Sequence, residues 1–79
     1  MMTGNQLRAA RALLGWSQAQ VAEASGLSIP TIKRAEGSGN LTASADAIDR
    51  IKKALEASGV VFISPNGGGA GVRLRVRED

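Results

Sequence analysis

The sequence predicts a mainly α-helical domain, with four helices in residues 1–59 and a β-hairpin in residues 60–79. Up to Gly59, apolar residues recur with the 3.6-residue period of amphipathic helices. After Gly59 they alternate with the two-residue period of strands. Glycines and serines separate the periodic segments, as expected for helix ends and turns. The chain has 79 residues, which is the size of one small domain.

Composition excludes several classes of function. The chain contains no Cys and no His, which removes disulfides, Cys/His zinc sites, thiol nucleophiles and imidazole catalysis. We therefore expect no enzyme, no metal and no cofactor. The net charge of +3 favours a polyanionic partner. No apolar run approaches the roughly 20 residues of a membrane span, and Arg8 and Arg11 interrupt the region where a signal peptide needs apolar residues. A cytoplasmic protein without membrane contact is expected.

The first helix is predicted to begin at residue 4 or 5, because Thr3 and Gln6 have the spacing of a capping box. Gly15 should end it, and Trp16 should anchor the junction with the next helix in the core. The predicted apolar face of this helix comprises Leu7, Ala10, Leu13 and Leu14.

The next two helices are short and are joined by a turn at Gly26 and Leu27. Ser17 and Gln20 repeat the capping-box spacing, and the second helix should run to about residue 24. Gly26 is the expected left-handed turn residue. Ser28 should cap a third helix over residues 29–36, in whose first turn a proline is tolerated. The side chains predicted to be buried are Val21, Ala22, Ala24, Leu27, Ile32 and Ala35. Two short helices joined in this way predict a helix-turn-helix, whose second helix fits the DNA major groove.

The fourth helix should begin after Thr42 or Ser44 and end before Gly59, with Ile48, Ile51 and Leu55 on its apolar face. Strands are predicted over residues 60–63 and 72–77, joined by a glycine-rich turn. Two strands alone are marginal in water. The hairpin must therefore pack on the helices, pair with another chain, or do both.

The pattern W-S-Q-x-x-V-A-x-x-S-G-L-S-x-x-T-I-x-R-x-E-x-x-G, which runs from Trp16 to Gly39, resembles the phage-repressor-like (Cro/repressor, XRE) helix-turn-helix family. The resemblance covers residues 4–58. The tail A-L-E-A-S-G-V-V-F-I-S-P-N-G-G-G-A-G-V-R-L-R is similar to that of small bacterial members, which carry a short β element instead of a fifth helix. The resemblance implies a sequence-specific regulator of transcription that binds double-stranded DNA.

The resemblance also implies roles for individual residues. Arg11 and Glu36 should form a structural ion pair between the first helix and the end of the third. Gln18 should clamp a phosphate and brace the recognition helix, or else only cap its own helix. The residues implied in DNA binding are Gln18, Ser28, Ile29, Pro30, Thr31, Lys33, Arg34, Ser38 and Asn40.

Side-chain chemistry indicates which of these residues suit a base and which suit a phosphate. An arginine at position 34 can recognise guanine through two hydrogen bonds, a contact that contributes about 1–3 kcal/mol of discrimination. Lys33 is better suited to a phosphate. Ile29 either touches a thymine methyl group or acts as a hydrophobic staple at the helix start.

One recognition helix reads few base pairs, so we expect a homodimer on two half-sites about 34 Å apart. The predicted dimer interface is the hairpin, through Val60, Phe62, Val72, Leu74 and Val76. Arg73, Arg75 and Arg77 form either a solvated face or additional phosphate contacts. The alternative function is an antitoxin-like or accessory module that binds a protein partner and uses the helix-turn-helix as a scaffold.

Overall fold

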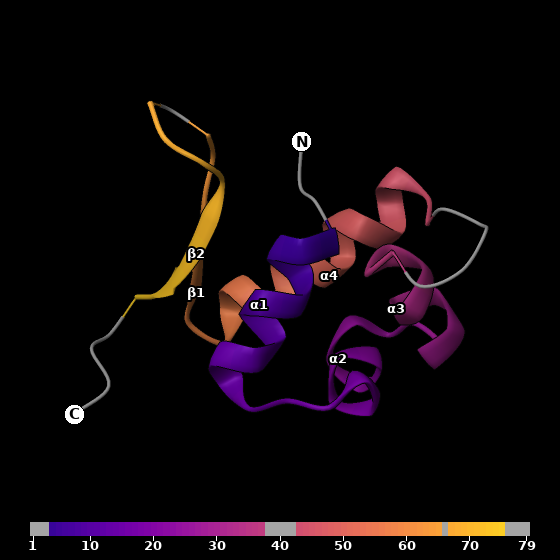
Figure 1. The fold of residues 1–79 in the computed structure, drawn as a ribbon. Coiled ribbons are helices and arrows are strands. Elements are labelled where there is room, and N and C mark those ends of the chain that lie inside the picture. The colour runs from indigo at the N-terminus through magenta and orange to yellow at the C-terminus, as the bar shows by residue number, and fades with distance from the viewer. Residues whose placement is uncertain (1–3, 38–42, 66, 76–79) are drawn as a thin grey trace.

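The computed structural model describes residues 4–37, 43–65 and 67–75, and it confirms four helices followed by an antiparallel hairpin. Figure 1 shows α1 at the centre, with α2 and α3 toward one side and the hairpin on the other, while α4 runs behind α1 from the α3 side to the start of β1. The elements are α1 (Gly4–Leu14), α2 (Gln18–Ser25), α3 (Ile29–Ala35), α4 (Ala45–Ala57), β1 (Val60–Ile63) and β2 (Gly71–Leu74).

Serine caps set the starts of three helices, as the sequence predicts. The hydroxyls of Ser17, Ser28 and Ser44 accept hydrogen bonds from the backbone N–H groups of residues three positions further on. Ser17 and Gln20 form the complete capping box. The alternative cap at Thr42 lies outside the described residues. Gly26 ends α2 in the left-handed region, with a φ of 74°, which only glycine adopts without a steric penalty.

Helix α3 ends one residue earlier than predicted. Its last helical residue is Ala35, and Glu36 is the C-cap, with φ −81° and ψ 1°. The chain then turns through Gly37, whose φ is 90°. Glu36 thus lies at the junction of helix and loop.

The core is small and aliphatic. Its largest fully buried side chains come from α1, α2, α3 and α4, and they are Leu7, Val21, Ile32, Ile51 and Leu55. Trp16 and Leu27 are partly buried and pack against this core, as does Ile48. Burying such side chains stabilises each helix more than its own intrinsic propensity does.

Two residues predicted to be buried are exposed. Leu13 is 39% exposed, because it lies six residues after Leu7 and so falls off the stripe that Leu7, Ala10 and Leu14 form. Ala24 is exposed because Val21 and Ala22 already define the buried face of α2.

The hairpin packs one face against its own helices. Val60 pairs with Leu74, and Phe62 pairs with Val72. Val60 is buried, and the other three side chains are half-buried against the core. Strand β2 ends at Leu74, although the N–H of Arg75 still donates to the Gly59 carbonyl at 2.7 Å. The rest of the predicted strand, which includes Val76 and Arg77, lies outside the described residues.

A buried amide fixes the hairpin to α1. The Nε2 of Gln6 donates to the carbonyls of Ile63 and Gly71, at 3.3 and 3.2 Å. These carbonyls lie opposite each other in the ladder, so one side chain holds both strands. The predicted capping box also involves Thr3, which lies outside the described residues.

Candidate nucleic-acid interface

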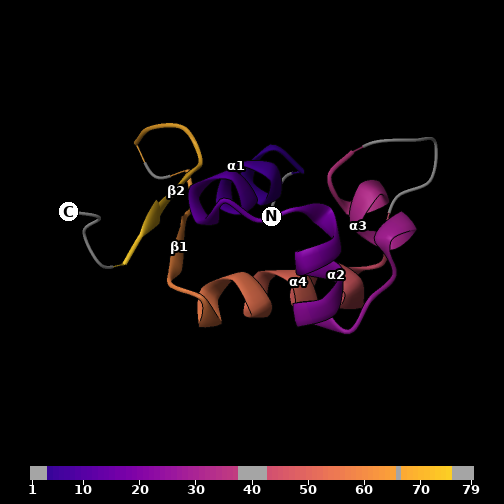
Figure 2. The ribbon, with the colours of Figure 1, turned by 90° about the horizontal axis from the view of Figure 1, so that it is seen from below.

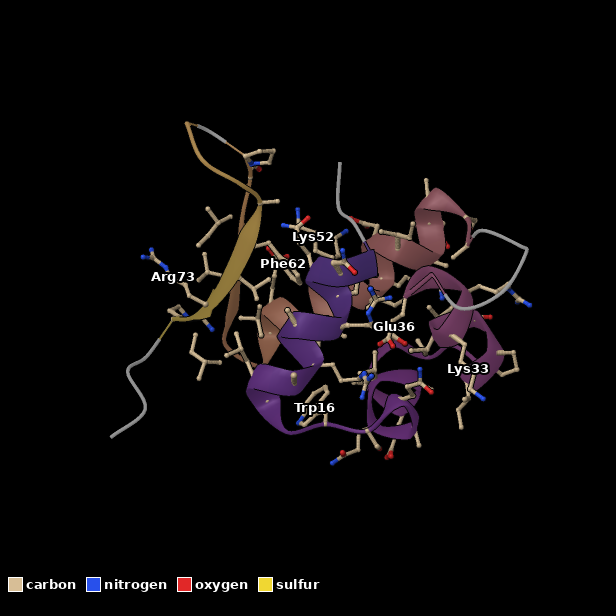
Figure 3. The ribbon with its side chains drawn as sticks, viewed as in Figure 1. Trp16, Lys33, Glu36, Lys52, Phe62 and Arg73 are labelled. Carbon is tan, nitrogen blue, oxygen red and sulfur yellow. The ribbon has the colours of Figure 1, made fainter. Side chains whose placement is uncertain are left out.

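The outward face of α3 is the candidate interface. Ile32 and Ala35 are buried and fix the helix to the core. Ile29 is 41% exposed, and Pro30 and Lys33 are also exposed. Figure 3 shows Lys33 on the outer side of α3, directed away from the rest of the domain. The four residues predicted to read bases, which include the half-buried Arg34, therefore lie on one seven-residue helix without forming part of the core.

A chain of polar contacts runs along one flank of this face. The hydroxyls of Ser28 and Thr31 are 2.8 Å apart, and Arg34 donates through Nη2 to the Thr31 hydroxyl at 3.3 Å. Arg34 is thereby held near the N-terminal turn of its own helix. Because a guanidinium carries five N–H donors, this contact leaves others available for a ligand.

Glu36 is the polar anchor of α3. Its side chain is only 3% exposed, and Oε2 accepts from Arg11 Nε at 2.8 Å, which confirms the predicted ion pair. Its Oε1 accepts from Arg11 Nη2 at 3.2 Å. Arg11 also donates through Nη1 to the Trp16 carbonyl at 3.1 Å, which ties the start of α2 to the same cluster. A buried carboxylate is stable here because its charge is paired and its oxygens are hydrogen-bonded.

Gln18 belongs to this network as well. Its Nε2 donates to Glu36 Oε1 at 3.0 Å, so the first residue of α2 is linked to the end of α3. An amide nitrogen carries two N–H donors, and the second is not used by this bond. The role of Gln18 in DNA binding stays a prediction.

Sequence reasoning missed a third support of α3. Gly4 lies so close to the end of α3 that a Cβ built on it would be 2.8 Å from the carbonyl carbon and oxygen of Glu36. Arg8 donates to that same Glu36 carbonyl and to the side chain of Asn5. A glycine at the start of a helix is usually interpreted as marking the helix boundary. The position of Gly4 in the sequence therefore did not indicate its contact with the Glu36 backbone.

The charge of the interface is positive. In the described part of the chain, neither Lys33 nor Arg34 forms an ion pair, whereas the one carboxylate near the end of α3 is occupied by Arg11. Two unpaired cations on an exposed helix face suit a phosphate-bearing ligand.

Two of the residues predicted to bind DNA cannot be located in the described structure. Ser38 and Asn40 lie outside the described residues. Over residues 4–37, 43–65 and 67–75, no group of three acidic or otherwise metal-binding side chains could hold a metal ion. Within the same ranges, no helix is long and apolar enough to cross a membrane.

Comparison with known families agrees with this geometry. The sequence profile of a helix-turn-helix domain family matches residues 4–62, which covers all four helices and most of β1. The chain belongs to this helix-turn-helix domain family, and this membership points to DNA as its partner. No curated protein shows significant sequence similarity to the chain.

Proposed function

We propose that the protein is a sequence-specific regulator of transcription, of the phage-repressor-like type, that binds double-stranded DNA as a homodimer in the cytoplasm. Helix α3 enters the major groove. The observation that carries this proposal is the outward face of α3, where two unpaired cations stand on a helix held from behind by the Arg11–Glu36–Gln18 network. A reading helix must be held rigidly, because base discrimination depends on hydrogen-bond geometry.

Arg34 is the proposed base reader. Its guanidinium is restrained by Thr31, which lowers the conformational entropy lost on binding guanine. Lys33 is exposed, and it contributes a phosphate contact. Ile29 and Pro30 offer only apolar surface, so they favour a thymine methyl group or a matching groove shape.

The phosphate contacts come from the flanks of α3. Gln18 retains an N–H that can reach a phosphate while the other N–H stays on Glu36. Ser28 and Thr31 offer hydroxyls at the start of α3. The corresponding roles of Ser38 and Asn40 rest on the family resemblance.

The homodimer is proposed to form through the hairpin. In Figures 1 and 2 the hairpin and α3 lie at opposite ends of the domain, so contacts at one end leave the other free. Val60 is already buried in its own core. A second copy would therefore meet the still exposed parts of Phe62, Val72 and Leu74, together with Val76.

Selection from random DNA sequences with the purified protein tests this function. We expect one enriched motif made of two related half-sites. Arg34→Ala should broaden the preference at one or two base pairs, whereas Gln18→Ala should weaken all sites alike. Arg50→Ala is the matched control, because it removes the same charge from an exposed arginine that pairs with Asp46 on α4.

Two results would contradict the proposal. One is the absence of any enriched motif together with tight binding to a protein. The other is an Arg34→Ala variant whose sequence preference equals that of the Arg50→Ala control.

A further inference from the structure

The outward face of α3 is divided along its length into an apolar half and a cationic half. Helical side chains four positions apart lie above one another on the same face. Two such pairs stand on the outer side of α3, and they are Ile29 with Lys33 and Pro30 with Arg34. Each pair has an apolar residue in the first turn and a cation one turn later. The polarity of this surface therefore changes along the helix axis.

None of these four side chains carries a hydrogen-bond acceptor. Lysine has three N–H donors and arginine has five, whereas the side chains of isoleucine and proline have no polar atom. In the major groove, adenine presents an amino group at N6 and cytosine presents one at N4. Recognition of either amino group requires a side-chain acceptor, such as the amide oxygen of Asn or Gln or the carboxylate of Asp or Glu. The four side chains therefore cannot recognise the amino groups of adenine and cytosine.

The hydroxyls on the flank of α3 are engaged within the helix. Thr31 Oγ1 accepts from Arg34 Nη2 at 3.3 Å and lies 2.8 Å from Ser28 Oγ. Ser28 Oγ accepts from the backbone N–H of Thr31 at 3.3 Å and so caps the helix. When Ser28 donates to Thr31, both acceptor sites of the Thr31 oxygen are occupied and its own O–H remains as a donor. The flank then adds a donor, rather than an acceptor, to the face.

A face that has only donors and apolar groups can recognise two features of the major groove. Guanine presents two acceptors, O6 and N7, which one guanidinium contacts through two N–H groups. Thymine presents a C5-methyl group, which favours apolar contact. Arg34 therefore suits guanine, and the apolar first turn at Ile29 and Pro30 suits the methyl group of thymine.

The length of α3 sets the spacing between these two features. Residues four positions apart are separated by about 6 Å along a helix axis, whereas adjacent base pairs are about 3.4 Å apart. The hydrogen bond to Thr31 draws the guanidinium of Arg34 back toward the first turn. A helix that lies along the groove therefore places its apolar turn and this guanidinium about one to two base-pair steps apart.

We propose that each recognised half-site contains an A·T pair read through the methyl group of thymine and, about one to two base-pair steps away, a G·C pair read through O6 and N7 of guanine. The apolar first turn of α3 contacts the A·T pair, and Arg34 contacts the G·C pair. The amino groups of adenine and cytosine make no contact with α3. This inference rests on the proposed function and specifies the DNA that α3 recognises.

Base analogues in the selected duplex test this reading directly. Replacing the thymine of the recognised A·T pair by deoxyuridine removes only the methyl group, and the affinity should fall about fourfold, as expected for one buried group of that size. Replacing the guanine by 7-deazaguanine removes the N7 acceptor, and the affinity should fall about tenfold or more, because a hydrogen bond to a charged group is lost. The same replacements outside the motif are the controls and should leave the affinity unchanged.

Protein variants assign each analogue effect to its half of α3. The double variant Ile29→Ala, Pro30→Ala should bind the thymine and uracil duplexes equally. Arg50→Ala, which removes an exposed arginine of α4, should keep the fourfold ratio of the unaltered protein. Each ratio compares two duplexes with one protein, so a smaller fraction of folded protein in a variant cancels.

Arg34→Gln supplies the acceptor that the face lacks. A glutamine can contact both N6 and N7 of adenine. Selection with this variant should therefore replace the G·C pair of the motif by an A·T pair, and the new preference should persist with uracil in place of thymine. Arg50→Gln is the matched control and should keep the original motif.

The outcomes separate this inference from the proposed function. A motif whose A·T pair tolerates uracil without loss would overturn the inference and leave the function intact, because adenine or the shape of the groove would then be read. A motif without a G·C pair beside the A·T pair would overturn it as well. The absence of any motif would overturn the function and the inference together.

Discussion

The two ends of the domain are attached to α1 by different chemistry. At the α3 end, the Glu36 carboxylate accepts from Arg11 of α1 and from Gln18. At the hairpin end, the neutral amide of Gln6 donates to one carbonyl on each strand. Both anchors are buried, and both connect segments that are distant in the sequence. Helix α1 thus positions both α3 and the hairpin.

The difference between an ion pair and a neutral amide predicts how much stability is lost when each anchor is removed. Removing one partner of a buried ion pair leaves an uncompensated charge, which costs about 3–5 kcal/mol. Losing a neutral hydrogen bond costs about 0.5–1.5 kcal/mol. Helix α3 is therefore expected to be held more firmly than the hairpin.

The largest effect is expected for Glu36→Leu. Because Arg11 is still 25% exposed, we expect the low end of the range, about 3 kcal/mol of lost unfolding free energy. Urea denaturation measures this loss. Glu23→Leu is the matched control, since Glu23 is exposed on α2, and its change should stay within about 0.5 kcal/mol. Equal losses in the two variants would show that the buried pair does not hold α3.

Gly4→Ala should have the next largest effect. Its Cβ would lie 2.8 Å from the Glu36 backbone, and such overpacking costs about 1–3 kcal/mol. The end of α3 must shift, so DNA affinity should fall together with stability. Gly68→Ala, where a Cβ meets nothing within 4 Å, should change neither quantity. A fully stable Gly4→Ala variant would refute the close contact.

Gln6→Leu should cost about 1 kcal/mol, because two neutral hydrogen bonds are lost and an apolar side chain of similar size is gained. Hydrogen exchange should accelerate in β1 and β2 and remain unchanged in α3. Gln18→Leu should give the opposite pattern, with faster exchange at the end of α3. If both variants loosen the same end, the two attachments are not independent.

The smallest effect concerns an exposed ion pair on α4. The hydrogen bond and charge of Asp49 raise the pKa of Lys53 above its ordinary value of 10.5. A raised pKa gives stability that is present below pH 10.5 and is lost as the pH rises through the folded value. The small stability difference between the protein and Asp49→Asn should therefore vanish in strongly alkaline solution. A difference that grows with pH would contradict this sign.

The sequence was sufficient for the parts of the fold that depend on local chemistry. Serine caps determine where α2 and α3 begin, the left-handed Gly26 limits α2, and the change of apolar period locates β1. The Arg11–Glu36 pair was implied by the family pattern. Gln6 and Gly4 were not predictable in their tertiary roles, because their partners lie more than 30 residues away and a capping signal already explained both.

For the hairpin, too, the sequence pattern predicted the local structure but not the tertiary contacts. Its alternation predicted which side chains share a face. It could not predict that α1 covers this face, because alternation alone is equally consistent with burial against a second chain.

The most direct test of DNA reading by α3 is an NMR titration of the protein with a duplex obtained by the selection. We expect large amide shifts at Gln18 and over residues 28–34 other than Pro30, which has no N–H, and small ones over residues 60–63 and 71–74. Shifts concentrated in the hairpin, with α3 unperturbed, would contradict the assignment of α3 as the helix that reads DNA.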